Sequence, residues 1–409
     1  MLWGPTTNQR TKVFTMHPIT FTVQPAGQSH ALTVNVTDLL SHVSTVPDQR
    51  HRRGVRYPLP VLLTIAVLAK LCGQSRVHAV ADWARARAPE LAAAFGLART
   101  QMPHPTTWSR VLGVGVAAAA IEAALQPLLA PPKPVVPLRA SQHLALDGKT
   151  LRGTIPAGTS SGVHLLALYD VNAGTVLRQV AVGAKANELA AAPHLVDAQW
   201  LAGALVPGDA RFAQRSLSTQ IVEAGGDYCW IVKANQRALY ENLRLLLGPQ
   251  PAALPGTSPI PDDFVTVRTI ENAHGRLDQR ELTVSSLLAD DHPWPSLAQA
   301  FQIVRTCWRG RRRTREVRYG ITSVPATLLP AERLLQAVRG HWQIENGLHY
   351  RRDVSLAEDA SRVRMGHAPE VLATLNNVVC TLVAHANLPN LAAVQRAMSA
   401  QVDRWLFRR

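Results

Sequence analysis

Three acidic residues lie in segments whose neighbours could hold a carboxylate at the edge of a core. Asp147 and Asp209 each follow an apolar run, in LALDGKTLRG and LVPGDARFAQ, and Glu345 lies in HWQIENGLHYRRD. Two aspartates at neighbouring strand ends and a glutamate on a later helix would form an all-oxygen site, the ligand set that Mg²⁺ prefers. One or two such ions are suited to in-line phosphoryl transfer. The pattern therefore predicts chemistry on a phosphodiester.

Each of these carboxylates also has an ordinary structural interpretation. An aspartate before glycine, as at Asp147, is typical of a turn at the end of a strand, and Asp209 allows the same interpretation. Glu345 alone could pair with His341 or His349, because residues four apart share a helix face. Three carboxylates just downstream compete with Glu345 as the third ligand, and the residues alone leave that choice open: Asp353, Glu358 and Asp359.

The elements that would position the carboxylates follow from a change of hydrophobic period near residue 141. The segments predicted to be strands are 143–147, 163–170, 175–183, 204–209 and 227–234, and those predicted to be helices are 188–198 and 212–225. The resulting order, β-β-β-α-β-α-β with one helix still to come, is that of a ribonuclease H-like domain.

The remaining helix is delayed by a mostly strand-like stretch from about 248 to 328. Only then does PAERLLQAVRGHWQIENGLHYRR begin, with Pro330 suited to its first turn. On a single helix, Glu345, His349 and Arg352 would share one face, with His341 one turn earlier. We therefore expect an α/β fold: a ribonuclease H-like catalytic domain at 141–385, interrupted by a mostly β insertion.

Other segments are predicted to flank this domain. Residues 1–40 mix Pro, Gly, Thr and Gln without a clear period and are predicted to be loosely ordered. Residues 41–130 have helical periodicity, which indicates a small all-helical domain, and the proline-rich 131–140 is predicted to be a semi-rigid linker. Residues 386–409 are predicted to form a basic C-terminal helix or tail.

The chain as a whole is strongly basic. It carries 43 lysines and arginines against 28 aspartates and glutamates, a formal charge of +15, which favours nucleic acid as the partner. Its 409 residues are enough for at least two domains. The four cysteines form no CxxC pair, so neither a zinc site nor a disulfide framework is predicted. The longest apolar run, 61–69, is shorter than the roughly 20 residues that a membrane helix requires.

Four segments resemble the ISAs1 family of bacterial insertion-sequence transposases, a branch of the IS4-like DDE enzymes: LALDGKTLRG, GDARFAQRS, GGDYCWIVKANQ and HWQIENGLHYRRDVSLAEDASRVRMGHAPE. The resemblance covers about residues 40 to 385. Within it, RRGVRYPLPVLLTIAVLAKLCG is similar to the family's transposase-associated N-terminal domain.

The resemblance implies roles for particular residues. Asp147, Asp209 and Glu345 match the three catalytic, metal-binding carboxylates, with Mg²⁺ as the cofactor and Mn²⁺ as a substitute. Gln214 and the KANQ segment, 233–236, match positions that flank the second carboxylate. The wider IS4-like group has a Y-(2)-R-(3)-E-(6)-K pattern around its glutamate, and this sequence departs from it. Val338 replaces the tyrosine, His341 the arginine and Arg352 the lysine, while Glu345 matches.

Several basic residues are candidates for contact with DNA. Lys149, Arg152 and Arg352 are expected to hold phosphate oxygens near the carboxylates, as a point charge or as guanidinium forks. For His349 a surface or DNA-facing position is favoured over metal binding. The other candidates are Lys233, His341 and a run at a predicted hairpin tip, for which a solvated loop is the alternative: Arg311, Arg312 and Arg313.

The reaction that the resemblance implies is Mg²⁺-dependent cleavage at the ends of an insertion sequence, followed by transfer of the freed 3′-OH into target DNA. The partners would be double-stranded DNA, as terminal inverted repeats and target, and further copies of this chain as a dimer or larger multimer. A catalytically inactive DNA-binding remnant or transposition repressor is the alternative, and a structure-selective nuclease is a third interpretation. We expect a cytoplasmic protein, associated with the bacterial nucleoid, with no membrane and no small-molecule substrate.

Overall fold

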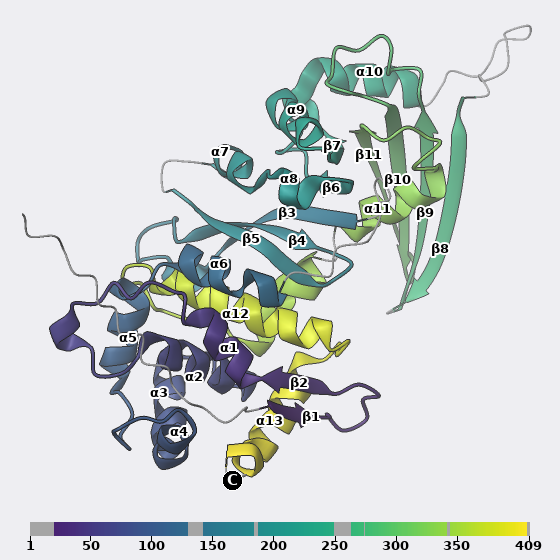
Figure 1. The fold of residues 1–409 in the computed structure, drawn as a ribbon. Helices are drawn as coiled ribbons and strands as arrows, with labels where there is room; N and C mark the ends of the chain where they lie inside the picture. The colour runs from purple at the N-terminus through teal and green to yellow at the C-terminus, as the bar shows by residue number, and fades with distance from the viewer. Residues whose placement is uncertain are drawn as a thin grey trace, which may run out of the picture. The chain divides into compact units, whose positions relative to one another are not determined.

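The computed structural model describes residues 20–129, 142–183, 187–248, 263–273, 275–341 and 344–406. Their contacts divide the chain into two units (Figure 1). The helical unit comprises Met1–Leu128, Ser355–Ala357 and Arg364–Arg409, and the sheet unit comprises Leu129–Val354 and Glu358–Val363. The predicted linker, 131–140, lies outside the described residues.

The sheet unit is built on one sheet, which has nine strands within the described residues, in the order β5-β4-β3-β6-β7-β11-β10-β9-β8. Its first three strands form an antiparallel meander, while β6 runs parallel to β3 and β7 parallel to β6. The bounds are β3 (Gln142–Thr150), β4 (His164–Asp170), β5 (Thr175–Val182), β6 (Ala204–Gly208) and β7 (Asp227–Val232). The α/β class and the order of these strands confirm the prediction.

The predicted insertion forms strands that continue the same sheet. They are β8 (Val265–Ala273), β9 (Arg276–Ser285), β10 (Gln299–Arg309) and β11 (Arg312–Thr322), and β11 pairs antiparallel with β7. At this junction a Cβ on Gly320 would lie 2.1 Å from Phe301 Cζ and 2.6 Å from the Trp230 carbonyl oxygen. The junction therefore requires glycine, because any side chain would collide with its neighbours.

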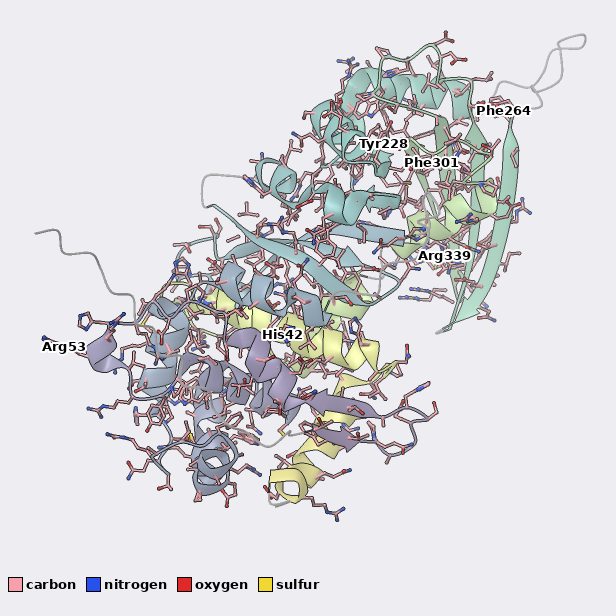
Figure 2. The ribbon with its side chains drawn as sticks, in the orientation of Figure 1. His42, Arg53, Tyr228, Phe264, Phe301 and Arg339 are labelled. Carbon is pink, nitrogen blue, oxygen red and sulfur yellow. The ribbon has the colours of Figure 1, made fainter. Side chains whose placement is uncertain are left out.

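Helices cover both faces of this sheet. Alternation along β7 sends Tyr228 and Trp230 into a core with α9 (Arg215–Glu223) and α10 (Arg237–Leu247). Cys229 and Ile231 face the opposite core, which includes α11 (Ala331–Gly340). Figure 2 labels Tyr228 from the first core and Phe301 from the second. Such a strand, buried on both faces, reads as a continuous apolar run.

The single helix predicted at 188–198 is wrong. The chain instead forms α7 (Glu188–Ala191), a 3₁₀ turn (Ala192–Leu195) and α8 (Ala198–Leu201). Pro193, near the start of the 3₁₀ turn, lacks the N–H that a continuous helix would need there. Asn187 and Asp197 cap the two short helices, since their side chains accept from Ala190 N and Gln199 N.

The helical unit is organised around α2 (Leu59–Leu71), which is buried along nearly its whole length. A helix that is apolar on every side needs partners on every side. The others of this unit are α1 (Val36–Val43), α3 (Val77–Ala86), α4 (Ala88–Ala94), α5 (Pro105–Val114), α6 (Ala118–Leu129), α12 (Ala368–His385) and α13 (Leu391–Leu406).

Two predicted boundaries differ from this arrangement. α12 belongs to the helical unit, although it was expected in the catalytic domain. α13 belongs to the same unit and lies where a basic C-terminal helix or tail was expected. Lys70 of α2 explains part of the difference: its buried Nζ lies 2.7 Å from Asn376 Oδ1 in α12. Residues 20–40 are not loosely ordered either, since they form β1 (Thr20–Val23), β2 (Leu32–Asn35) and most of α1.

No single helix among the described residues has the length and apolar character to cross a membrane. One bent pair, α5 with α6, passes that test only when the two helices are joined across an 88° bend.

Candidate active site

Asp147 lies inside β3, not at the strand end that the sequence suggested. The strand continues to Thr150, and Asp147 pairs in register with Ala167 of β4. Its Oδ1 accepts from the N–H of Gly148 at 2.9 Å. The simple turn interpretation is therefore wrong, and this carboxylate projects from the middle of an ordered strand.

Burial and neighbouring charges act strongly on Asp147. Burial raises its pKa to about 7, opposed by the Gly148 N–H and assisted by the charges of Glu188, Asp209 and Glu345. A half-buried acid among other acids favours its neutral form unless a cation is present. Such surroundings occur often at catalytic sites, and here they coincide with the predicted first carboxylate.

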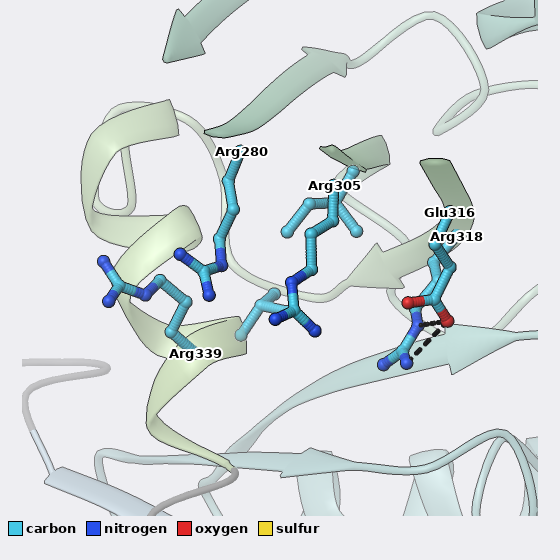
Figure 3. Close-up of a pocket in the computed structure, with 7 residues that line it drawn as sticks. Arg280, Arg305, Glu316, Arg318 and Arg339 are labelled. Atoms are coloured by element: carbon cyan, nitrogen blue, oxygen red, sulfur yellow. Dashed lines mark hydrogen bonds and ion pairs between the residues drawn. The ribbon is translucent and has the colours of Figure 1, made fainter. Parts of the chain in front are cut away.

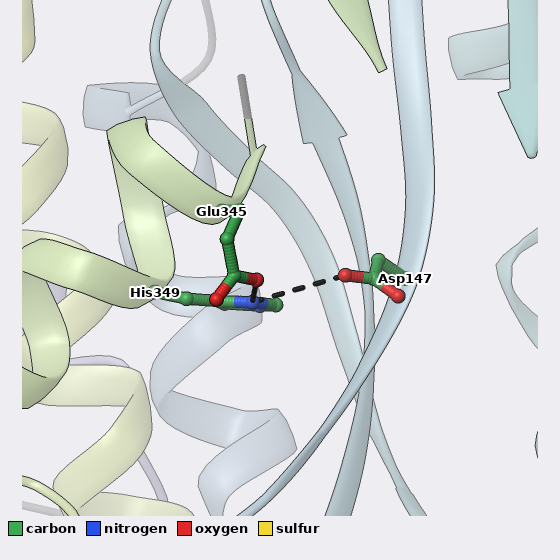
Figure 4. A group of neighbouring side chains, drawn as sticks. All are labelled: Asp147, Glu345 and His349. Atoms are coloured by element: carbon green, nitrogen blue, oxygen red, sulfur yellow. Dashed lines mark hydrogen bonds and ion pairs between the residues drawn. The ribbon is translucent and has the colours of Figure 1, made fainter. Parts of the chain in front are cut away.

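Glu345 approaches Asp147 together with His349 (Figure 4). One ligand atom from each of the three side chains lies within 4.8 Å of the others. Nδ1 of His349 lies 3.0 Å from Oε2 of Glu345 and 3.8 Å from Oδ2 of Asp147. The Glu345 side chain is 71% exposed, whereas that of His349 is 5% exposed. A buried imidazole therefore orients an exposed carboxylate toward the strand.

The backbone that carries Glu345 differs from the single helix that was predicted. α11 ends at Gly340, and π-helical turns form Glu345–His349 and Arg351–Ser355. π-helical turns are rare and occur frequently at functional sites. Within this turn, Glu345 and His349 lie in hydrogen-bonding reach of each other.

Asp209 directly follows β6, the strand that neighbours β3. The KANQ segment holds the chain beyond it, because Asn235 Nδ2 donates to the carbonyl of Ala210 at 2.8 Å and Gln236 Nε2 to that of Ala213 at 2.9 Å. Asp209 is exposed and lies outside the 4.8 Å group, although its charge acts on Asp147. The neighbouring-strand arrangement of the two aspartates was expected from the sequence.

The competing carboxylates downstream of Glu345 have other partners. Asp353 Oδ2 lies 2.7 Å from Lys149 Nζ, and Asp359 Oδ1 lies 3.5 Å from the same nitrogen. Glu358 Oε2 lies 2.8 Å from Arg352 Nε. Of the four acids between 345 and 359, Glu345 is the one grouped with Asp147.

These ion pairs also correct two expectations about DNA contact. Lys149 is engaged by two carboxylates and its side chain is 10% exposed. Arg352 is 1% exposed, and it contacts Gln179 as well as Glu358. A guanidinium buried against a carboxylate is committed to the fold, so Arg352 is not presented to a phosphate.

The two histidines are buried, which corrects the surface or DNA-facing position expected of them. Exposure is 8% for His341 and 4% for His349. Burial lowers the pKa of both rings, although the Asp209 charge opposes this at His341 and the Glu345 hydrogen bond opposes it at His349. Within the described residues, His349 Nε2 is buried without a hydrogen-bond partner.

The remaining basic candidates are exposed. The Arg152 side chain is 81% exposed, and Lys233 lies on the surface after β7. Gly310, with φ of 58°, turns the chain between β10 and β11, which confirms the predicted hairpin tip. The arginine run at that tip is exposed: Arg311, Arg312 and Arg313.

Sequence reasoning missed Glu188, His164 and Arg211. Glu188 is 8% exposed and is the charge that acts most strongly on Asp147. His164 and Arg211 both contact its carboxylate. No local signal marks Glu188, because a glutamate in the first turn of a helix is usually a solvated complement to the helix dipole.

Comparison with known proteins gives two family matches. Residues 139–382 match the family described as "Transposase DDE domain", and residues 40–127 match the family described as "DDE_Tnp_1-associated". The first match covers more than half of the chain.

Individual proteins show the same relationship. YncI of Escherichia coli O157:H7, provisionally named a transposase, is 27% identical over 86% of this chain and 88% of its own length. YhhI of Escherichia coli K12, provisionally named an H repeat-associated transposase, is 24% identical over 90% of this chain and 95% of its own length. A solved piggyBac transposase synaptic complex with hairpin DNA has a TM-score of 0.42 and 10% identity, covering 90% of this chain and 80% of its own, a likeness too weak to carry an argument. From the family match, this chain belongs to the DDE-domain transposases.

Proposed function

We propose that this chain is the transposase of an ISAs1-type insertion sequence, with a ribonuclease H-like catalytic domain. It would bind the terminal inverted repeats, cleave DNA there and join the freed 3′-OH to target DNA. The observation that carries this proposal is the grouping of Asp147, Glu345 and His349 within 4.8 Å, with Asp209 directly after the neighbouring strand. The match to the transposase DDE domain supports it.

The donor atoms of this site fit a divalent cation. Asp147 and Glu345 offer carboxylate oxygens at close range. Burial, and after it the charges of Glu188, Asp209 and Glu345, raises the pKa of Asp147, and a bound cation would offset both effects. Asp147, Asp209 and Glu345 would hold Mg²⁺, and Mn²⁺ would substitute because it accepts the same oxygen ligands. When bound, the metal would activate a water or a 3′-OH and stabilise charge on the phosphoryl oxygens.

The protein's own groups would prepare this site before DNA binds. His349 holds the Glu345 carboxylate through Nδ1, which fixes a side chain that is otherwise mostly exposed. Asn235 and Gln236 fix the segment that begins at Asp209. Preorganisation of this kind avoids the cost of ordering ligands during the reaction.

An arginine-rich surface supports DNA as the partner. It lies on the α11 side of β9, β10 and β11, where strand register places Arg305 between Arg280 and Glu316. Figure 3 shows Arg280, Arg305 and Arg339 beside one hollow. Its arginines, which we call the arginine face, are Arg276, Arg280, Arg305, Arg309, Arg312, Arg318 and Arg339.

The arginine face has more positive charge than its own acids neutralise. Among the described residues, the carboxylates paired with it are Asp278, Glu271 and Glu316, so seven arginines against three acids leave four positive charges in excess. Such an excess attracts the phosphate backbone, with an affinity that falls steeply with salt. Arg311 and Arg313 at the neighbouring hairpin tip, and Arg152 and Lys233 elsewhere, remain candidate contacts. Because two element ends must be processed together, we propose a dimer or larger assembly on DNA in the bacterial cytoplasm.

The proposal is tested with supercoiled DNA that carries the element's two terminal inverted repeats. Wild type should give cleaved and joined products only when Mg²⁺ is present. Asp147→Asn, Asp209→Asn and Glu345→Gln should lose both products while they retain gel-shift binding. The matched control is Glu332→Gln, an exposed carboxylate on α11, which should behave as wild type.

Two outcomes would favour other functions. Wild-type protein that binds the repeats and yields no metal-dependent product would support a DNA-binding remnant or a transposition repressor. Cleavage without any joined product would support a nuclease.

A further inference from the structure

A connected set of polar side chains lies beside Asp147 and outside the proposed metal ligands. Its centre is Glu188, the first residue of α7, whose side chain is 10% exposed. Oε1 of Glu188 lies 2.9 Å from Nε2 of His164, and the same oxygen contacts Nη1 of Arg211. Nδ1 of His164 lies 2.7 Å from Oγ1 of Thr150. The four residues therefore form a continuous chain of polar contacts.

This chain joins the two segments that carry the aspartates. Thr150 is in β3, three residues after Asp147, and Arg211 follows Asp209 by two residues. Glu188 therefore links the strand of the first carboxylate to the loop of the second. Among the described residues, the backbone pairing of β3 with β6 lies at 142–143, toward the other end of β3 from Thr150.

Gly148 shows how closely Glu188 packs against the strand. A Cβ placed on Gly148 would lie 2.5 Å from both Cδ and Oε1 of Glu188, and 2.7 Å from Nε2 of His164. The glycine after Asp147 thus makes room for this carboxylate. Glu188 therefore packs directly against the backbone next to Asp147.

A buried carboxylate is a costly way to fill this space. An apolar residue of similar volume often stabilises a fold as well as a buried ion pair does. A glutamate here instead supplies one oxygen that accepts from groups on two different elements. We infer that Glu188 is a positioning residue of the proposed active site, which sets the spacing of Asp147 and Asp209 through His164 and Arg211; this inference rests on the proposed function.

Glu188→Gln tests the inference, because it keeps the size of the side chain and removes its charge. Substitution of groups that orient metal ligands typically costs roughly 10- to 100-fold in metal affinity or activity. We expect a loss of this size in the single-turnover cleavage rate and in the affinity for Mn²⁺ alone, measured by calorimetry without DNA. Gel-shift affinity for the repeats should stay unchanged. Glu223→Gln, an exposed carboxylate at the end of α9, is the matched control.

Arg211→Gln gives a second test that does not depend on a buried substitution, since the Arg211 side chain is 61% exposed. Arg211→Gln should show the same loss of cleavage rate and Mn²⁺ affinity as Glu188→Gln. The double variant Glu188→Gln/Arg211→Gln should lose no more than either single variant, because the two residues act as one unit. Wild-type Mn²⁺ affinity and cleavage rate in both variants would overturn the inference. Wild-type protein that neither binds Mn²⁺ nor cleaves would instead overturn the proposed function.

Discussion

Replacing Arg352 by methionine should destabilise the sheet unit even when neither DNA nor metal is present. The Arg352 side chain is 1% exposed and contacts Glu358, itself 5% exposed, at 2.8 Å. Removal of one partner from a buried pair leaves an uncompensated charge and costs about 3–5 kcal/mol. At about 2–4 °C per kcal/mol for a unit of this size, the melting temperature should fall by roughly 6–20 °C.

The measurement is thermal unfolding of the DNA-free protein, followed by circular dichroism. Arg362→Met is the matched control, because Arg362 is exposed in the same unit and should change the free energy of unfolding by less than about 0.5 kcal/mol. Adding Glu358→Met to Arg352→Met should recover much of the loss, since the buried charge then disappears with its partner.

One result would refute this reasoning. If Arg352→Met melts at the wild-type temperature and loses affinity for DNA, then Arg352 faces the phosphate backbone, as its place in the sequence motif suggested.

Three further predictions follow from individual side chains. His349→Ala should slow metal-dependent cleavage by roughly 10- to 100-fold, because Glu345 loses the donor that orients it, and unchanged single-turnover rates would contradict this. Burial acts to raise the pKa of Asp278, but hydrogen bonds and charges from Cys307, Arg305 and Arg280 outweigh it, so the folded-state pKa is lowered. The ionised carboxylate therefore stabilises the fold at pH values above its unfolded pKa of about 3.9. That stabilisation is lost as the pH falls through the lower folded-state pKa. Asp278→Asn should therefore lower the melting temperature at pH 7 and progressively less below about pH 4; equal differences at pH 7 and pH 3 would argue against it. A thiol reagent should label Cys307 of the native protein before the other cysteines, as measured by mass spectrometry at early labelling times. Labelling of a buried cysteine before Cys307 would contradict this prediction. The other three cysteines, Cys72, Cys229 and Cys380, are buried. Burial raises the pKa of the Cys72 and Cys229 thiols to about 12, which keeps them in the unreactive thiol form.

The order of strands could be predicted because each strand has its own apolar signal. β3 and β6 end their apolar runs near Asp147 and Asp209, so the neighbouring-strand arrangement of the aspartates follows from local pattern and element order. Turn chemistry was less informative. Asp147-Gly148 resembles a strand-end turn, yet the strand continues, because Gly148 is required by the packing of Glu188 and not by a turn.

The roles of basic residues could not be predicted from spacing alone. Helical periodicity places Arg352 on the face of Glu345, but it does not show which residues of that face are covered. Arg352 is buried against Glu358, whereas Arg152 remains exposed. Only contacts between distant segments, such as Lys149 with Asp353, decide which charges remain available to DNA.

The assignment of α12 to the helical unit also depends on contacts between distant segments. The transposase DDE match extends to residue 382 and so includes nearly all of α12, whereas the contacts of this helix group it with the helical unit. α12 is buried on most sides, including Asn376, which accepts from Lys70 of α2. A helix buried in this way has no polar face from which the sequence could indicate its partners.

The central claim of the proposed mechanism is that Asp209 binds the catalytic metal with Asp147 and Glu345. The decisive measurement is DNA cleavage by Asp209→Cys in Mg²⁺ and in Mn²⁺, because a thiolate binds the softer Mn²⁺ better than Mg²⁺. If Asp209 binds the metal, Asp209→Cys should give almost no product with Mg²⁺ and recover part of its activity with Mn²⁺, while Glu332→Cys should cleave with either ion. Undiminished cleavage by Asp209→Cys in Mg²⁺ would contradict this claim.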